Sequence, residues 1–92
     1  MRRVVVTGFG GVSALGHSWP EIKENLLKGH TGTRRLQEWA DIKGMHTELA
    51  APIMPISFEG RWPRKKTRTM GIVSYYSLYS TEQAMRDANL EN

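Results

Sequence analysis

The sequence contains no cysteine among its 92 residues. These residues can therefore form no disulfide, supply no thiolate to a metal and provide no thiol nucleophile. They also contain no apolar run approaching the ~20 residues of a membrane span. Residues 1–6 lack the apolar core and cleavage site of a signal peptide. We therefore expect a cytoplasmic protein that makes no membrane contact.

Histidine, which can bind metals and transfer protons near neutral pH, is also scarce. The histidines are His17, His30 and His46, and they are isolated from carboxylates at metal-ligand spacing. Histidines placed in this way more commonly serve on the surface or in loops than in a metal or catalytic site. We therefore predict that residues 1–92 contain no metal site and no catalytic residue.

The composition is that of an ordinary globular protein, with 39% hydrophobic and 24% charged residues. A single small domain is the most that 92 residues allow. A chain of this size buries only about 60 to 65% of its unfolded surface, so its stability alone is modest. We expect it to fold when its apolar faces have partners.

A β-branched run followed by a glycine-rich loop occupies Val4–Gly16. A dinucleotide site would need the pattern G-x-G-x-x-G and an acidic residue about 20 positions further on. Gly8 and Gly10 begin that pattern, but Ser13 stands where the third glycine belongs, and no second apolar strand ending in an acid follows. The sequence favours glycines that allow close backbone contact where a buried strand, Val4–Thr7, leaves a sheet. Nucleotide binding is the weaker alternative.

Two helices are predicted, with a weaker pattern between them. Ser18 and Glu21 form a capping box for a helix over residues 19–28, which Gly29 ends. Residues 31–63 indicate only a short helix near 36–39 and an extended edge segment near 48–56. A long helix is expected over residues 69–88. One face of it is lined mostly by small side chains, which allow another backbone to approach: Met70, Val73, Ser77, Ser80, Ala84 and Ala88.

Positive charge gathers just before this long helix. No acid occurs between Glu59 and Glu82, and the cations in that interval are Arg61, Arg64, Lys65, Lys66 and Arg68. Cations near a helix N-terminus are mildly unfavourable, which indicates an anionic partner rather than local stability. A merely solvated face stays open as an alternative. An acidic protein fits better than nucleic acid, because the run is short and has a single flanking aromatic residue, Trp62.

The order of these motifs carries a resemblance to a known family. "RRVVVTGFGGVSALG", a helix followed by "KGHTG", and "RKKTRTMG" leading to "TEQAMRDANL" resemble the N-terminal segment of a β-ketoacyl-acyl-carrier-protein synthase of the elongating type. The likeness covers nearly the whole chain, with residues 35–56 as its variable part. Asn89 stands where the family usually has glycine, and asparagine is the next-best residue for a left-handed helix terminus.

The resemblance implies an α/β fold. Residues 1–92 would be a partial N-terminal half of the thiolase-like α/β/α/β/α domain, with no complete domain and no cofactor. The family reaction is a decarboxylative Claisen condensation of an acyl thioester with malonyl-carrier protein, in fatty acid or related polyene synthesis. Its catalytic cysteine and two histidines lie downstream of this segment. The complete enzyme would be a homodimeric acyltransferase, and this chain alone would be inactive.

The resemblance also assigns a partner to the basic run. In similar synthases, basic residues of an R-K-x-x-R-x-M segment contact the acidic helix of acyl carrier protein. Those positions are Lys65 and Arg68 here, with Arg64 and Lys66 as neighbours, whereas Thr69 replaces a cation found in some members.

Three accounts of the length are open. The chain is a fragment of a synthase, a protein completed by another chain, or a stand-alone binding module or cysteine-less partner subunit that docks an acidic protein through Arg64–Arg68. A chain with one strand and its first helices cannot close a sheet, so the fragment is favoured.

Overall fold

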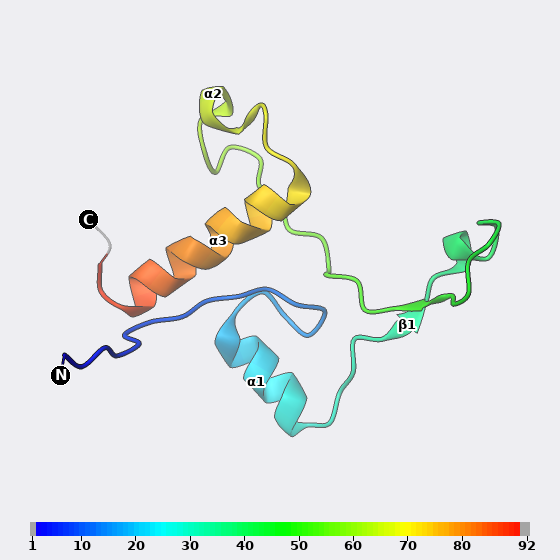
Figure 1. Cartoon of the computed structure of the whole chain (residues 1–92), viewed down its shortest axis with the longest axis horizontal. Helices are drawn as coiled ribbons and strands as arrows, with labels where there is room; N and C mark the ends of the chain where they lie inside the picture. The colour runs from blue at the N-terminus through cyan, green and yellow to red at the C-terminus, as the bar shows by residue number, and fades with distance from the viewer. Residues whose placement is uncertain (1, 91–92) are drawn as a thin grey trace. The chain divides into compact units, whose positions relative to one another are not determined.

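The computed structural model describes residues 2–90. In chain order its elements are α1 (Trp19–Leu27), β1 (Arg34–Arg35), η1 (Gln37–Trp39), β2 (Leu49–Ala50), α2 (Arg64–Thr67) and α3 (Ile72–Asp87) (Figure 1). The chain forms two compact units, one of Ser13–Met54 and one of Met1–Val12 with Pro55–Asn92. Each unit is described by itself below. Within residues 2–90, no helix is long and apolar enough to cross a membrane.

Helix α1 belongs to the first of these units and begins and ends close to the predicted bounds. Ser18 is its N-cap in extended conformation, and Gly29, with φ 73°, follows its C-terminus in the left-handed region that glycine favours. The predicted capping box is wrong, because the Ser18 side chain makes no capping hydrogen bond. The Glu21 side chain lies instead against Gly16, where an added Cβ would be 2.7 Å from its Cγ.

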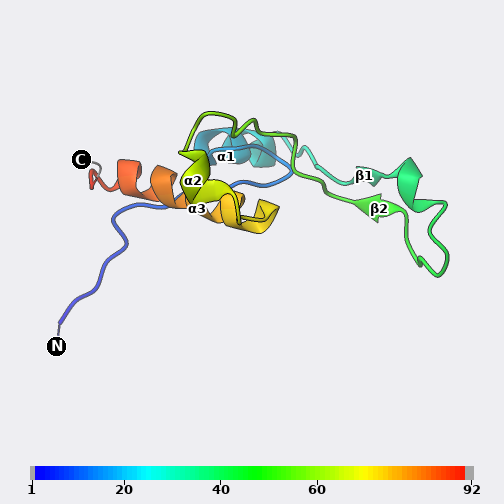
Figure 2. The same ribbon diagram turned by 90° about the horizontal axis from the view of Figure 1, so that it is seen from above.

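A short antiparallel hairpin joins β1 and β2 in the same unit. Arg34 pairs with Ala50 and Arg35 with Leu49, and Figure 2 shows the two strands side by side. The Arg35 side chain donates a hydrogen bond to Glu48 next to this pairing. The 3-10 helix η1 lies in the connection, which confirms the short helix expected near residues 36–39.

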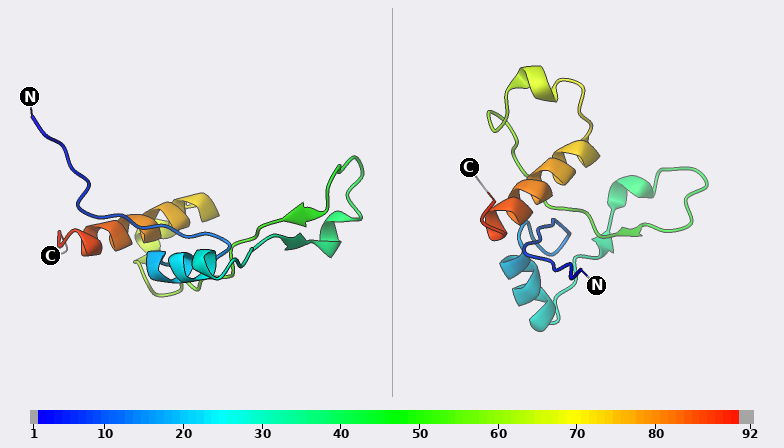
Figure 3. Two further views of the ribbon diagram at one scale, coloured as in Figure 1. Left: turned by 90° about the horizontal axis from the view of Figure 1, so that it is seen from below. Right: turned by 60° about the vertical axis from the view of Figure 1, so that its left-hand side comes forward.

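The other unit is built on α3. Residues 8–12 run beside its C-terminal half (Figures 1 and 3). A Cβ added at Gly8 would lie 2.4 Å from the carbonyl oxygen of Ala84, and one added at Gly10 would lie 2.5 Å from that of Ser80. Neither position has room for a side chain. The prediction that glycine serves close backbone contact is confirmed at these two positions, and the small-residue face is its partner.

Residues 4–7 form no strand in the structure, contrary to the prediction of a buried core strand. Val4 is 93% exposed and Val6 is 84% exposed. A strand needs a hydrogen-bonded neighbour, and the only sheet among residues 2–90 is the β1–β2 pair. The sequence pattern therefore describes a strand whose sheet partner the described residues do not supply.

The long helix begins later than predicted, at Ile72 rather than near Thr69. Gly71 is its N-cap, with φ −85° and ψ 176°, and this extended residue separates α3 from the shorter helix α2. At the other end Asn89 has φ 59°, which confirms the left-handed terminus predicted there. The basic run is thus a turn of its own, and its cations do not form the first turn of α3.

Candidate functional site

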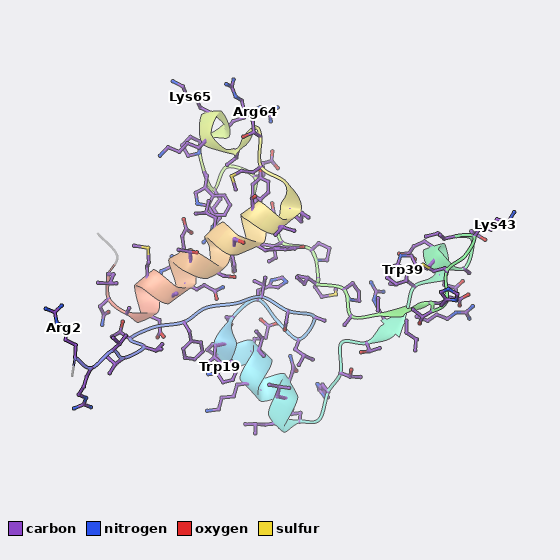
Figure 4. All side chains as sticks on the ribbon, viewed as in Figure 1. Arg2, Trp19, Trp39, Lys43, Arg64 and Lys65 are labelled. Atoms are coloured by element: carbon purple, nitrogen blue, oxygen red, sulfur yellow. The ribbon has the colours of Figure 1, made fainter. Side chains whose placement is uncertain are left out.

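The basic turn, Arg64–Arg68, consists of α2 and its C-cap. The backbone N–H of Arg68 donates to the carbonyl oxygen of Arg64 at 2.9 Å and closes the turn. Its four cations are exposed, whereas Thr67 is buried with 9% of its surface accessible. Figure 4 shows Arg64 and Lys65 extending outward from this turn. One side chain therefore anchors the turn while the charged ones face solvent.

The four cations of the basic turn have no acidic partner within residues 2–90. The ion pairs in that part of the chain are Lys28–Glu24, Arg35–Glu48 and Arg61–Glu82, and none involves the basic turn. A cluster of like charges without internal compensation creates a positive potential that attracts an anionic surface. This is the electrostatic feature that the sequence predicted, although the helix-dipole argument for it does not apply to the observed helix bounds.

Arg61 differs from the other cations of the run. Its Nη2 lies 3.2 Å from Oε2 of Glu82, and its guanidinium carbon lies 4.9 Å from the centre of the Tyr79 ring. The same carbon lies 5.5 Å from the centre of the Trp62 ring. Arg61 is therefore held against α3 by an ion pair and by aromatic contacts, and its charge is largely compensated within the unit.

An aromatic cluster joins the segment before the basic turn to α3. Phe58 is its centre, stacked on Trp62 at 5.6 Å and on Tyr75 at 5.0 Å between ring centroids. Tyr76 and Tyr79 meet the same Phe58 ring edge-on at 6.1 and 6.0 Å. Stacked and edge-to-face pairs of this kind stabilise beyond the area they bury. The three tyrosines of α3 are thus packed against Phe58, a residue to which sequence reasoning gave no role.

Glu82 connects this cluster to the ion pair. Its Oε1 accepts a 2.6 Å hydrogen bond from the indole N–H of Trp62, and its Oε2 accepts one from Arg61. The Trp62 hydrogen bond is the main reason that the pKa of Glu82 lies below its ordinary value. Partial desolvation acts in the opposite direction, and Arg61 and Arg86 add to the lowering. The carboxylate is thus stabilised in its charged form.

Tyr75 forms a second attachment of the basic turn to α3. Its hydroxyl donates to the backbone carbonyl of Thr67 at 3.5 Å, which is at the long end of hydrogen-bond geometry. Thr67 is also the buried residue of the turn. The basic turn is therefore attached to α3 at two points, through Trp62 before it and through Thr67 within it.

Two backbone N–H groups of the glycine loop are bonded to side chains of α3. The N–H of Phe9 donates to Oδ2 of Asp87, and the N–H of Gly11 donates to Oε1 of Gln83, each at 3.2 Å. A phosphate cradle needs free N–H groups and no carboxylate beside them. These N–H groups are satisfied by side chains of α3, and one of those is acidic. The structure thus supports the close-contact interpretation of the loop.

Two of the histidines make local contacts within the unit Ser13–Met54. A ring nitrogen of His17 lies 2.8 Å from the carbonyl oxygen of Met54, and a ring nitrogen of His30 lies 3.2 Å from Oδ1 of Asn25. Within residues 2–90 there is no group of three histidine, aspartate or glutamate side chains that could hold a metal ion. The local contacts of His17 and His30 fit the loop role that the sequence indicated.

Comparisons with known proteins bear on the whole chain. Residues 1–92 match the family described as Beta-ketoacyl synthase, N-terminal domain. The chain is 36% identical over 90 residues to 3-oxoacyl-[acyl-carrier-protein] synthase 1 of Escherichia coli (strain K12), covering 98% of this chain and 22% of that protein. It is 34% identical over 89 residues to 3-oxoacyl-[acyl-carrier-protein] synthase II, chloroplastic, of Arabidopsis thaliana, covering 97% of this chain and 16% of that protein.

A solved structure also matches this chain along its whole length. The crystal structure of a beta-ketoacyl synthase from Burkholderia phymatum STM815 matches with a TM-score of 0.91 and 46% sequence identity, over 100% of this chain and 22% of that one. The chain therefore belongs to the beta-ketoacyl synthase family and matches its N-terminal domain. Its fold is α/β, of the thiolase-like kind, as the resemblance predicted. The chain spans about a fifth of the length of this structure and of the bacterial relative.

Proposed function

We propose that residues 1–92 are the N-terminal part of a 3-oxoacyl-[acyl-carrier-protein] synthase, an acyltransferase that condenses an acyl thioester with malonyl-carrier protein. The proposal is supported by relatives of that name aligned over 98% of the chain. The chain has no cysteine, so a cysteine nucleophile would have to come from outside these residues. The complete enzyme would be a homodimer in fatty acid synthesis or a related polyene route.

This segment's own contribution is a docking surface for acyl carrier protein. The observation that carries this is the basic turn, because its four cations are exposed and have no acidic partner within residues 2–90. Lys65 and Arg68 would make the principal contacts with the acidic carrier, with Arg64 and Lys66 assisting. Thr69 would leave the surface weaker by one contact. Charges at the edge of an interface act mainly on association rate and on salt dependence.

Charge reversal tests the docking surface in the protein at its natural length. K65E/R68E should weaken carrier binding by roughly tenfold or more at low salt and flatten its salt dependence. The matched control is K23E/K43E, which makes the same charge change at two exposed lysines in the other unit. The docking proposal fails if K65E/R68E binds the carrier as the wild type does, or if the control loses as much affinity.

A non-catalytic alternative has its own distinguishing measurement. The same basic turn would serve a binding module or a cysteine-less partner subunit that docks an acidic protein. The intact mass of the natural protein separates the module from the two longer forms, because a synthase is several times larger than 10.5 kDa, and the presence of a cysteine nucleophile separates the synthase from the partner subunit. A natural species of that mass would support the module, and a long chain with a cysteine nucleophile would support the synthase.

A further inference from the structure

The basic turn cannot hold its own conformation. Helix α2 is four residues long, and a single helical turn is not stable without tertiary contacts. The segment before it contains Gly60, with φ 72°, and Pro63, the N-cap of α2, so regular structure does not continue through it. The position of the four cations is therefore set by contacts to α3.

Two of those contacts converge on one carboxylate, and the Tyr75 hydroxyl makes a separate and longer contact with the Thr67 carbonyl. Glu82 accepts from the indole of Trp62 through one oxygen and from Arg61 through the other, so both oxygens hold the segment that enters the turn. The aromatic packing of Phe58 is less directional, whereas two charge-assisted hydrogen bonds fix a position. Glu82 lies in the third turn of α3, a helix of 16 residues.

We propose that Glu82 is a positioning residue for carrier recognition: by holding Trp62 and Arg61 on α3, its carboxylate presents the basic turn in a preformed arrangement. The inference rests on the proposed docking function. A loose turn would have to be ordered when the partner binds, and ordering long side chains and a loop weakens association. If the turn is already held in place before the carrier binds, this loss of affinity does not occur.

The proposal predicts the opposite of what simple electrostatics predicts. Removing the negative charge of Glu82 makes the region more positive and frees Arg61, so a purely electrostatic surface would bind an acidic carrier more tightly. A positioned surface would bind it less tightly, because the turn becomes mobile. The sign of the change in affinity therefore distinguishes the two.

The experiment compares E82Q with E59Q in the protein at its natural length, using acyl carrier protein as the probe. Glu59 is exposed, lies in the same segment and has no ion pair within residues 2–90, so E59Q makes the same charge change without touching the contact. We expect E82Q to weaken binding by roughly threefold to tenfold, the size expected for a partly exposed charge-assisted contact. E59Q should leave binding unchanged or slightly stronger.

Three further measurements separate positioning from general damage. Amide hydrogen exchange should speed up in residues 58–68 of E82Q and stay unchanged in α1. In the active synthase, E82Q should raise KM for carrier-bound substrate and retain kcat. W62F removes the indole N–H that donates to Glu82. The double variant W62F/E82Q should therefore lose less carrier affinity than the sum of the losses in the two single variants.

Each outcome decides one of the two proposals. If K65E/R68E weakens binding and E82Q binds as tightly as E59Q, the positioning role is wrong and the docking surface stands. If K65E/R68E has no effect on carrier binding, the docking function itself is wrong. A loss of kcat in E82Q with unchanged KM would overturn the positioning role in favour of a general effect on the fold.

Discussion

The indole Nε1 of Trp62 donates a 2.6 Å hydrogen bond to Oε1 of Glu82, joining two residues that are 20 positions apart in the chain. This contact connects the segment that carries the positive charge to the helix that supports it. The other carboxylate oxygen accepts from Arg61 at 3.2 Å, so one side chain serves both partners. The pair therefore links the segment that enters the basic turn to the third turn of α3.

Replacing Trp62 with phenylalanine should lower the free energy of unfolding by about 1 to 2 kcal/mol, because Glu82 loses a directed donor while the aromatic stack is largely retained. Urea denaturation of the protein at its natural length measures this. Trp39→Phe is the matched control, since Trp39 lies in η1, in the other unit. An equal loss in both variants would contradict the role given to the Trp62 hydrogen bond.

The contribution of Glu82 to stability should depend on pH in the acid range. The folded pKa of Glu82 lies below its ordinary value of about 4.5, so its contribution is present above that value and is lost as pH falls through the folded pKa. The difference in unfolding free energy between wild type and E82Q should therefore shrink below pH 4.5. The measurement is urea denaturation across pH 3 to 7, roughly the span over which a carboxylate titrates. A difference that stays constant with pH would show that the charge of Glu82 does not matter.

Alanine at Gly8 should destabilise the fold by about 1 to 3 kcal/mol, because its Cβ would lie 2.4 Å from a carbonyl oxygen of α3. Alanine at Gly11 is the control, since an added Cβ there meets nothing within 4 Å. Thermal unfolding of both variants provides the comparison. If the two lose the same stability, the close approach of the loop to α3 is not what requires glycine.

The C-terminus of α3 offers a test of backbone conformation. Asn89 has φ 59°, a region that disfavours alanine by about 1 kcal/mol or more. Asn89→Ala should lower the melting temperature, whereas Asn89→Gly should be neutral or slightly stabilising because glycine adopts this conformation freely. A lower melting temperature for the glycine variant would indicate that the asparagine side chain, rather than its backbone, is what matters.

Sequence reasoning predicted several local features because neighbouring residues decide them. The bounds of α1, the short helix near Trp39, the glycine after α1 and the left-handed Asn89 follow from caps and turn residues close in the chain. The family was also predicted, since the order and spacing of motifs identify it without coordinates.

Three predictions could not be made correctly in this way. Val4–Thr7 has a strand pattern but no pairing partner among the described residues, the side chain of Ser18 makes no cap, and Gly71 separates the basic turn from α3. A residue pattern indicates which element a segment is able to form. Strand pairing and helix capping depend instead on which residues lie beside the segment in the folded protein.

The sequence by itself determined the family, the helix α1, most of the long helix α3 and the accumulation of positive charge between Arg61 and Arg68. Only the tertiary structure decided that Arg61 forms an ion pair with Glu82 while the cations of the basic turn stay exposed. The physical reason is that charge content is additive along a chain. Whether a given charge is compensated depends on an acid about 20 residues away, and folding alone brings that acid into contact.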